Sequence, residues 1–225
     1  MIRAIAFDLD DTLLDTTGLL LPAAARRACE VMRDKGLNCS LETCLQWRAE
    51  LSTRFSHKEI FRKIAERAGH GENSSLGEAG MRSFYHSPIP DSLPLLEGAD
   101  EVLKSVHGRY KMFLVTSGET ETQWNKVRAT GLTARFQEIF VVDKMRSENK
   151  RDVFHRILRQ ENLRPDELLS VGNRLAEEIR QAKELGARTC YFEYGEHVGE
   201  RIEKAEDKPD FTVRAWKDFL RTCRL

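Results

Sequence analysis

The sequence predicts an α/β protein with a doubly wound, Rossmann-like parallel sheet as its core and a small all-α helical cap inserted into it. Two observations predict this class. From residue 94 onward, short apolar segments alternate with amphipathic segments of about 10 to 15 residues, which is typical of a parallel sheet covered on both faces. The preceding stretch carries helical patterns but no strand pattern. We therefore expect residues 1–17 and 94–225 to form the core and residues 18–93 to form the cap.

Three of the four expected cap helices carry their own start or stop signal. Pro22 and Gly36 delimit the first helix, since proline favours the first turn and glycine the end. Ser40 is placed to cap the second helix, and Ser56 with Glu59 has the pattern of a capping box before the third. The expected cap helices cover residues 21–36, 40–55, 56–69 and 78–87, and a loop begins at residue 71 before the last of them.

The expected core elements follow a proline-rich connector at residues 88–98. Runs of apolar residues without helical periodicity predict the strands, and amphipathic runs predict the helices. The expected helices lie within residues 99–109, 122–131, 151–163 and 175–186. The expected strands lie within residues 2–7, 110–118, 137–143, 165–173 and 187–195, and residues 210–223 are expected to hold a last short strand and helix.

The composition is that of an ordinary soluble globular protein. Hydrophobic residues make up 40% of the chain and charged residues 32%, and 36 basic side chains balance 36 acidic ones. A net charge of zero does not indicate a protein that coats nucleic acid, and no uncharged apolar stretch is long enough to span a membrane. The apolar run before Asp8 is too short for the core of a signal peptide. We expect a cytoplasmic monomer or homodimer that binds neither nucleic acid polymers nor membranes.

The cysteines do not predict a metal site. They form no CxxC pair, and no histidine lies at zinc-finger spacing from them. We expect buried free thiols of a reducing compartment. The five are Cys29, Cys39, Cys44, Cys190 and Cys223.

The stretch FDLDDTLLD, residues 7–15, places four aspartates at the end of the first expected strand. Two carboxylates about 4 Å apart cost each other about 4 kcal/mol near a protein surface, so water, a basic neighbour or a metal ion must compensate them. Asp8 and Asp10 lie at the strand end and are the candidates for chemistry. Asp11 and Asp15 are expected to lie off the site, in a solvated turn.

Polar side chains also follow the later strands, and ligands of open α/β sheets bind beyond the carboxyl ends of the strands. The second strand ends in Thr116 and Ser117, whose hydroxyls and following amides suit a phosphate oxygen. Further candidates are Lys144 and Lys150 after the third strand, with Lys150 favoured, and Asn173, Glu177 and Glu178 after the fourth.

In these motifs the chain resembles the haloacid dehalogenase superfamily of aspartate-nucleophile phosphatases over nearly its whole length. DLDDTL, from Asp8, is similar to the first family motif, DxDx(T/V)-hydrophobic, and LVTSG resembles the second. Lys150 resembles the lysine of the third motif, and LSVGNRLAEEI resembles the fourth, whose common form is GDxxxxD. The helical insertion resembles the cap of the first subclass.

The resemblance implies magnesium-dependent hydrolysis of a small phosphate monoester through an aspartyl-phosphate. Asp8 would be the nucleophile and Asp10 the general acid and base, a division of labour that the chemistry requires. Thr116, Ser117 and Lys150 would hold the phosphate, and Lys150 would also offset negative charge. The Mg²⁺ ligands would come from Asp8, the carbonyl of Asp10, Asn173 and Glu178.

Asn173 and Glu178 depart from the family pattern, which commonly has Asp at both positions. They leave open a decayed binding or regulatory protein, and they lead us to expect weakened magnesium affinity. A dehalogenase or a phosphomutase of the same superfamily is a further alternative, although Asp10 counts against the first because a dehalogenase needs no second acid. The substrate and the specificity residues stay open. Cap side chains that could contact a substrate are Trp47, Arg48, Arg54, His57, Lys58 and Arg62.

Overall fold

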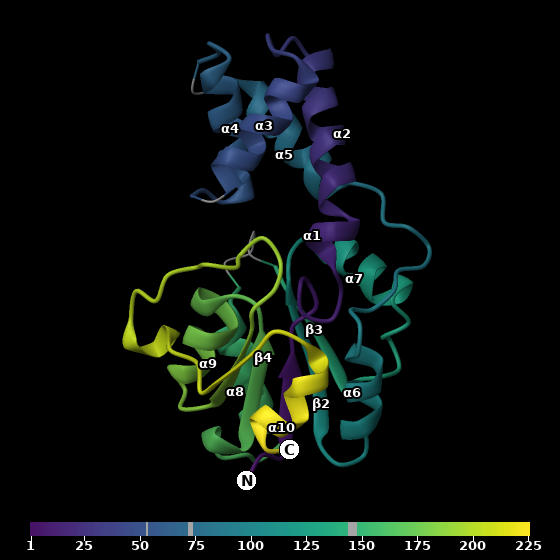
Figure 1. The fold of residues 1–225 in the computed structure, drawn as a ribbon, viewed down its shortest axis with the longest axis vertical. Coiled ribbons are helices and arrows are strands. Elements are labelled where there is room, and N and C mark those ends of the chain that lie inside the picture. Colours follow the sequence, from purple (N-terminus) through teal and green to yellow (C-terminus); the bar gives the residue numbers. More distant parts are fainter. Residues whose placement is uncertain (53, 72–73, 144–147) are drawn as a thin grey trace. The chain divides into compact units, whose positions relative to one another are not determined.

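The computed structural model describes residues 1–52, 54–71, 74–143 and 148–225. The chain forms two compact units (Figure 1). One unit combines Met1–Thr16 with Pro90–Leu225, and the other consists of Thr17–Ile89. Their separate roles as catalytic core and cap stay a prediction.

A six-stranded sheet forms the centre of the first unit. All neighbouring strands are parallel, and their order is β3-β2-β1-β4-β5-β6. Because the strand order reverses direction at β1, the carboxyl end of β1 is the switch point where such sheets bind ligands. The predicted doubly wound fold is confirmed. The strands are β1 Ala4–Phe7, β2 Lys111–Ser117, β3 Glu138–Val142, β4 Leu168–Gly172, β5 Arg188–Phe192 and β6 Phe211–Val213.

The two faces of the sheet are covered by different side chains. On one face, Phe154 of α8 and Ala182 of α9 pack with Ala6 and other strand residues. On the other face, Phe7 lies about 6 Å, centroid to centroid, from the rings of Trp216 and Phe219. Every residue of β1 is buried, as expected for a central strand covered on both sides.

The helices of this unit largely match the expected segments. A difference lies after β4, where one regular helix is expected over residues 175–186 and the structure has a π-helical turn, Leu175–Ile179, before α9. This wider turn places Glu178 beside β4, where Ser170 Oγ donates to the Glu178 carbonyl at 3.0 Å. The α-helices are α6 Ala99–Val106, α7 Thr120–Ala129, α8 Lys150–Gln160, α9 Arg180–Lys183 and α10 Phe219–Cys223.

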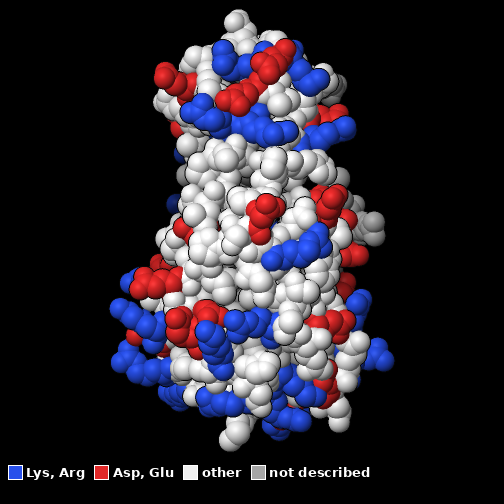
Figure 2. Space-filling model, turned by 90° about the vertical axis from the view of Figure 1, so that its right-hand side faces the viewer, with Lys and Arg blue, Asp and Glu red and all other residues white. Residues whose placement is uncertain are grey.

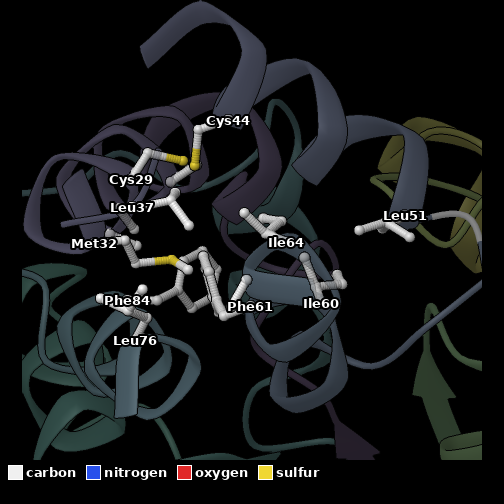
Figure 3. Packing of buried hydrophobic residues seen from close by; sticks show 14 residues of the cluster. Cys29, Met32, Leu37, Cys44, Leu51, Ile60, Phe61, Ile64, Leu76 and Phe84 are labelled. Atoms are coloured by element: carbon white, nitrogen blue, oxygen red, sulfur yellow. The ribbon is translucent and has the colours of Figure 1, made fainter. Parts of the chain in front are cut away.

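The described residues of the second unit form helices and the turns that connect them. Its buried side chains come from several helices and meet in one cluster, shown in Figure 3. The expected cap at Ser40 is present, since its hydroxyl accepts from the backbone N–H of Thr43 at 3.0 Å. The helices are α2 Leu21–Asp34, α3 Leu41–Ser52, α4 His57–Arg67 and α5 Ser75–Tyr85, and α1, Thr16–Leu19, runs into this unit from the first.

The start of α5 corrects the sequence interpretation. The glycines of residues 71–80 suggest a loop, but the helix begins at Ser75 behind an N-cap at Ser74. Gly77 and Gly80 serve helix packing instead. A Cβ at Gly77 would lie 2.8 Å from the Arg62 backbone, and one at Gly80 would lie 2.5 Å from the sulfur of Met32. Only glycine allows α5 to approach its neighbours this closely.

The long segment between β5 and β6 is anchored by a buried carboxylate. Asp207 has no exposed surface, and Arg180 donates to its two oxygens at 2.5 and 2.9 Å. The backbone N–H groups of Glu203 and Lys204 donate to the same carboxylate at 2.8 and 3.0 Å. Four donors therefore satisfy a charge that would otherwise be costly to bury.

We expect Asp207→Asn to lower the free energy of unfolding by about 3 kcal/mol, since it removes the main counter-charge of Arg180. Hydrogen bonding from Arg180 lowers the pKa of Asp207 from 3.8 to about 2. The pair therefore stabilises the fold above about pH 4, and this contribution is lost as the pH falls toward 2. Urea unfolding at about pH 7 and about pH 3 measures the difference. An equal deficit at both pH values would contradict this account, and Asp218→Asn, at an exposed carboxylate that contacts Arg221, is the control.

The outer surface carries charges of both signs. Figure 2 shows lysine and arginine side chains interspersed with aspartate and glutamate over the face in view. This distribution agrees with the net charge of zero. Within the described ranges, no helix has the length and apolar character needed to cross a membrane.

Candidate active site

The loop after β1 orients two of the aspartates. The backbone N–H of Asp8 donates to the Val171 carbonyl of β4 at 2.9 Å, which fixes Asp8 at the carboxyl end of the sheet. The N–H groups of Leu13 and Leu14 donate to the Leu9 carbonyl at 2.9 Å, so the chain turns back at once. Asp11 has a φ of +52° within this turn and is buried, contrary to the expectation of a solvated residue.

Lys150 bridges two buried carboxylates. Its Nζ lies 2.6 Å from Asp8 Oδ1 and also donates to Glu178 Oε1, and its exposed fraction is 1%. Glu178 Oε2 accepts from the backbone N–H of Arg174 at 2.9 Å, so both oxygens of Glu178 are engaged. Lys150 is the first residue of α8, which brings the third motif to the end of β1.

The buried cluster of Asp8, Lys150 and Glu178 contains more negative than positive charge. The pKa of Asp8 is raised from 3.8 to about 7: burial raises it most, Lys150 lowers it, and the neighbouring Glu178 and Asp10 raise it. Burial acts against the charge of Lys150, but Asp8 and Glu178 outweigh it and raise the pKa of the ammonium group. One lysine therefore does not fully stabilise the charge of Asp8.

Asp10 lies in a different environment, where three other side chains donate hydrogen bonds to its carboxylate. Its Oδ1 accepts from Thr16 Oγ1 at 2.5 Å and from Lys126 Nζ at 2.8 Å. Its Oδ2 accepts from Gln123 Nε2 at 2.8 Å. Burial alone would raise the pKa of Asp10, but Lys126 and the hydrogen bonds lower it below its ordinary value. The pKa values of the two carboxylates are thus shifted in opposite directions, so the two groups do not titrate together.

The end of β2 supplies hydroxyl groups. Thr116 is fully buried, and its Oγ1 accepts from Gln123 Nε2 at 2.7 Å, which leaves its own O–H free to donate. Gln123 Nε2 also lies 2.8 Å from the Ser117 carbonyl. The buried Ser117 hydroxyl has no hydrogen-bond partner among the described residues. Gln123 therefore ties the loop after β2 to Asp10.

The end of β4 supplies Asn173, which is 3% exposed. Its Nδ2 donates to the Tyr194 carbonyl at 3.2 Å. The amide oxygen of Asn173 therefore faces away from that carbonyl and is the acceptor atom of this side chain. The preceding Gly172 is required by the close approach of Glu178. A Cβ at Gly172 would lie 2.1 Å from Glu178 Cγ.

Comparison with known proteins agrees with this arrangement. Residues 5–192 match the family model of the haloacid dehalogenase-like hydrolases. The chain belongs to this family. The resemblance inferred from the motifs is therefore confirmed, and the chain is a hydrolase by membership.

Individual relatives extend this result. A glyceraldehyde 3-phosphate phosphatase from Pyrococcus abyssi is 31% identical over 87% of this chain and 83% of its own length. Another enzyme of that name, from Methanopyrus kandleri, is 27% identical over 100% of this chain and 98% of its own length. Among solved structures, YfnB from Bacillus subtilis, described as a HAD hydrolase bound to magnesium, has a TM-score of 0.67 at 20% identity. The structural match covers 98% of this chain and 97% of the YfnB chain.

The donor atoms of this family member fit a hard divalent cation. Across the described residues, no three His, Cys, Asp or Glu side chains form a group that could hold a metal ion. The available donors are the Asp8 carboxylate, the Asp10 carbonyl and the Asn173 amide oxygen, and Mg²⁺ binds oxygen donors of these kinds. The site also carries more negative than positive charge, which favours a bound cation. Its three carboxylates belong to Asp8, Asp10 and Glu178, and its two ammonium groups belong to Lys126 and Lys150.

The sequence interpretation missed two site residues. It expected a metal ion and Lys150 to compensate the negative charge of Asp10. Gln123 and Lys126 lie three residues apart on α7 and both contact Asp10. Their spacing places them on one face of the helix that follows the second motif. This spacing is the sequence feature that could have indicated that both side chains lie in the site. The competing candidate Lys144 lies outside the described residues, whereas Glu177 is partly exposed.

The cap candidates are described within their own unit. Arg48 is buried, its Nη2 lies 3.2 Å from His57 Nε2, and its guanidinium lies 5.8 Å from the ring centre of Phe84. Trp47 packs against the buried cluster, and Arg62 forms a 2.5 Å ion pair with Glu66. Arg54 is exposed, and the side chain of Lys58 lies outside the described part of the structure.

We expect Gly172→Ala to displace Glu178 and to lower both activity and stability. The added methyl group overlaps the middle of the Glu178 side chain, so the Lys150 bridge must shift, and overpacking of this kind costs about 1–3 kcal/mol. Urea unfolding and turnover with a phosphate ester measure the two effects. Gly71→Ala is the matched control, because nothing lies within 4 Å of its Cβ position. Equal behaviour of the two variants would show that the contact is unimportant.

Proposed function

We propose that this chain hydrolyses a small phosphate monoester through an aspartyl-phosphate on Asp8, with Mg²⁺ as cofactor. The observation that carries the proposal is the pair of neighbouring carboxylates with distinct partners, Asp8 with Lys150 and Asp10 with Lys126. A phosphatase of this kind needs a nucleophile and a separate acid/base group. A dehalogenase needs only the first, so Asp10 favours the phosphatase over that alternative.

In the first step, a carboxylate oxygen of Asp8 attacks phosphorus while the bond to the leaving oxygen breaks. Lys150 keeps Asp8 in place and offsets negative charge as it develops. The Thr116 hydroxyl and the buried Ser117 hydroxyl are donors available to the phosphoryl oxygens. When bound through Asp8, the Asp10 carbonyl and Asn173, Mg²⁺ supplies further charge compensation to the phosphoryl group.

Asp10 handles the proton in both steps. Its protonated form gives a proton to the leaving alcohol oxygen, and its carboxylate then accepts one from the water that attacks the aspartyl-phosphate. Phosphate departs and Asp8 is regenerated. Glu178, assigned to the metal on the sequence alone, is better placed to hold Lys150, because both of its oxygens are already engaged.

The test is release of inorganic phosphate with Mg²⁺ and with EDTA. Glyceraldehyde 3-phosphate is the first substrate to try, because two relatives carry the name of its phosphatase, and an aryl phosphate is the generic probe. Turnover that requires Mg²⁺ supports the proposal. Failure of both substrates together with a failure of beryllofluoride and Mg²⁺ to raise the melting temperature would favour the second candidate, a decayed binding protein, which the departures at Asn173 and Glu178 suggest.

Lys126 should set the descending limb of the pH profile, because Asp10 must be protonated to act as the acid of the first step. We expect Lys126→Met to raise the pKa of Asp10, because burial remains while the positive charge that lowers the pKa is gone. The descending limb of kcat/KM that reports Asp10 then moves to higher pH. Lys126→Arg keeps the charge and should leave the limb near its original position. Identical profiles for Lys126→Met and the unaltered enzyme would refute this role.

A further inference from the structure

Three cysteines of the helical unit gather at one corner, although the sequence places them in different elements. Cys29 lies on α2, Cys44 on α3, and Cys39 on the turn that joins the two helices. Cys39 packs against the buried cluster that contains Cys29 and Cys44, and the Cys44 thiol is close enough to both of the other thiols to interact with them. Figure 3 shows the sulfur atoms of Cys29 and Cys44 pointing toward one another. We call these three residues the thiol triad.

The thiol triad runs from the surface into the core. Cys39 is partly exposed, whereas Cys44 and Cys29 have no exposed surface. A reagent dissolved in water therefore meets Cys39 first. Arg33 lies beside the entrance, where its Nε donates to the Cys39 carbonyl at 3.1 Å. Access of Cys39 to solvent and the presence of a neighbouring thiol are what stepwise oxidation to a disulfide requires.

The core unit contains a useful contrast. Cys190 of β5 and Cys223 of α10 also lie within hydrogen-bonding reach of each other. Both thiols are buried, and neither has a partly exposed cysteine beside it among the described residues. The chain thus holds two sets of neighbouring thiols that differ in access from solvent. Access, rather than proximity alone, should decide which set reacts.

We propose that the thiol triad is a peroxide-sensitive modification site in which Cys39 is oxidised and Cys44 captures it as a disulfide. The Cys39 sulfur attacks one oxygen of hydrogen peroxide, the O–O bond breaks and water leaves, so that sulfur is oxidised to a sulfenic acid and peroxide is reduced. The Cys44 sulfur then attacks the Cys39 sulfur. The S–S bond forms, the S–O bond breaks, and the hydroxide leaves as a second water with the proton of the Cys44 thiol.

The neighbours of Cys39 affect the rate at which peroxide oxidises its thiol. Burial and Cys29 raise the pKa of the Cys39 thiol, and Arg33 opposes them. The reactive thiolate is therefore a minor form at neutral pH, and we expect slow oxidation that is best followed at about pH 8.5. Cys29 is not needed for either step, because Cys44 contacts Cys39 directly.

The experiment treats the full chain with hydrogen peroxide, quenches it with acid and measures thiols and intact mass. We expect loss of two hydrogens per chain and a peptide that contains the Cys39–Cys44 disulfide. Cys39→Ser should abolish this product. Cys44→Ser should leave a sulfenic acid on Cys39 that dimedone traps. Cys29→Ser and Cys223→Ser should retain the disulfide, and they serve as the matched controls.

Two results would overturn the proposal. The first is unchanged disulfide formation in Cys39→Ser, which would show that oxidation does not enter through Cys39. The second is oxidation of Cys190 and Cys223 before the thiol triad, which would show that access does not govern the reaction. Circular dichroism of each serine variant before treatment verifies that it is folded. Catalytic activity is not part of the readout, so the outcome is independent of the proposed phosphatase function.

Discussion

Asp8→Asn is expected to abolish the release of phosphate. The amide is a poor nucleophile and cannot form the aspartyl-phosphate, and removal of a catalytic nucleophile typically lowers kcat by a factor on the order of 10⁴–10⁶. The loss should persist at saturating substrate and magnesium, because it lies in the chemical step rather than in binding. Phosphate release under single-turnover and steady-state conditions measures it.

The control is Asp91→Asn, which makes the same chemical change at an exposed aspartate outside the site. It should retain full activity. Beryllofluoride adds a readout that does not depend on the choice of substrate, since it mimics a phosphorylated aspartate. With Mg²⁺ it should raise the melting temperature of the unaltered chain and leave that of Asp8→Asn unchanged. Residual turnover of Asp8→Asn above a hundredth of the original rate would exclude Asp8 as the nucleophile.

Lys150→Met is expected to damage both the fold and the reaction. The lysine is 1% exposed and pairs with the carboxylates of Asp8 and Glu178, so its removal leaves buried negative charge without compensation. Breaking a buried ion pair in this way costs about 3–5 kcal/mol of unfolding free energy. Turnover should fall by about 10²–10³, because the charge that stabilises the transition state is lost as well. Urea unfolding with EDTA and phosphate release with Mg²⁺ separate the two effects.

A second substitution tests the cause. Lys150→Met combined with Glu178→Gln removes one of the uncompensated charges, so it should recover part of the stability but not the activity. Lys104→Met breaks an exposed pair with Asp100 and is the control, for which we expect a change of less than about 1 kcal/mol. A double variant as unstable as Lys150→Met would show that packing, rather than charge, explains the loss.

Local sequence signals were strong where one physical effect dominated. The apolar runs of the strands predict a parallel sheet, because strands covered on both faces are apolar on both faces. The order of the motifs also predicts that Asp8 and Lys150 lie close together, since the carboxyl ends of parallel strands share one edge of the sheet. In the structure, Lys150 Nζ lies 2.6 Å from Asp8 Oδ1. The glycines of α5 were misread because a loop and a close helix contact both favour glycine, and the sequence does not distinguish the two.

The sequence by itself determined the family, the fold class and the motif residues, because periodicity and strand-end polarity are local properties. The tertiary structure alone decided how the charges are paired. It brought Lys126 to Asp10 from 116 positions away and turned Glu178 onto Lys150 through a π-helical turn. It also brought Cys29, Cys39 and Cys44 close together in the helical unit. Such partnerships depend on which helix faces pack together, and that is settled by the burial of the whole chain rather than by any short segment.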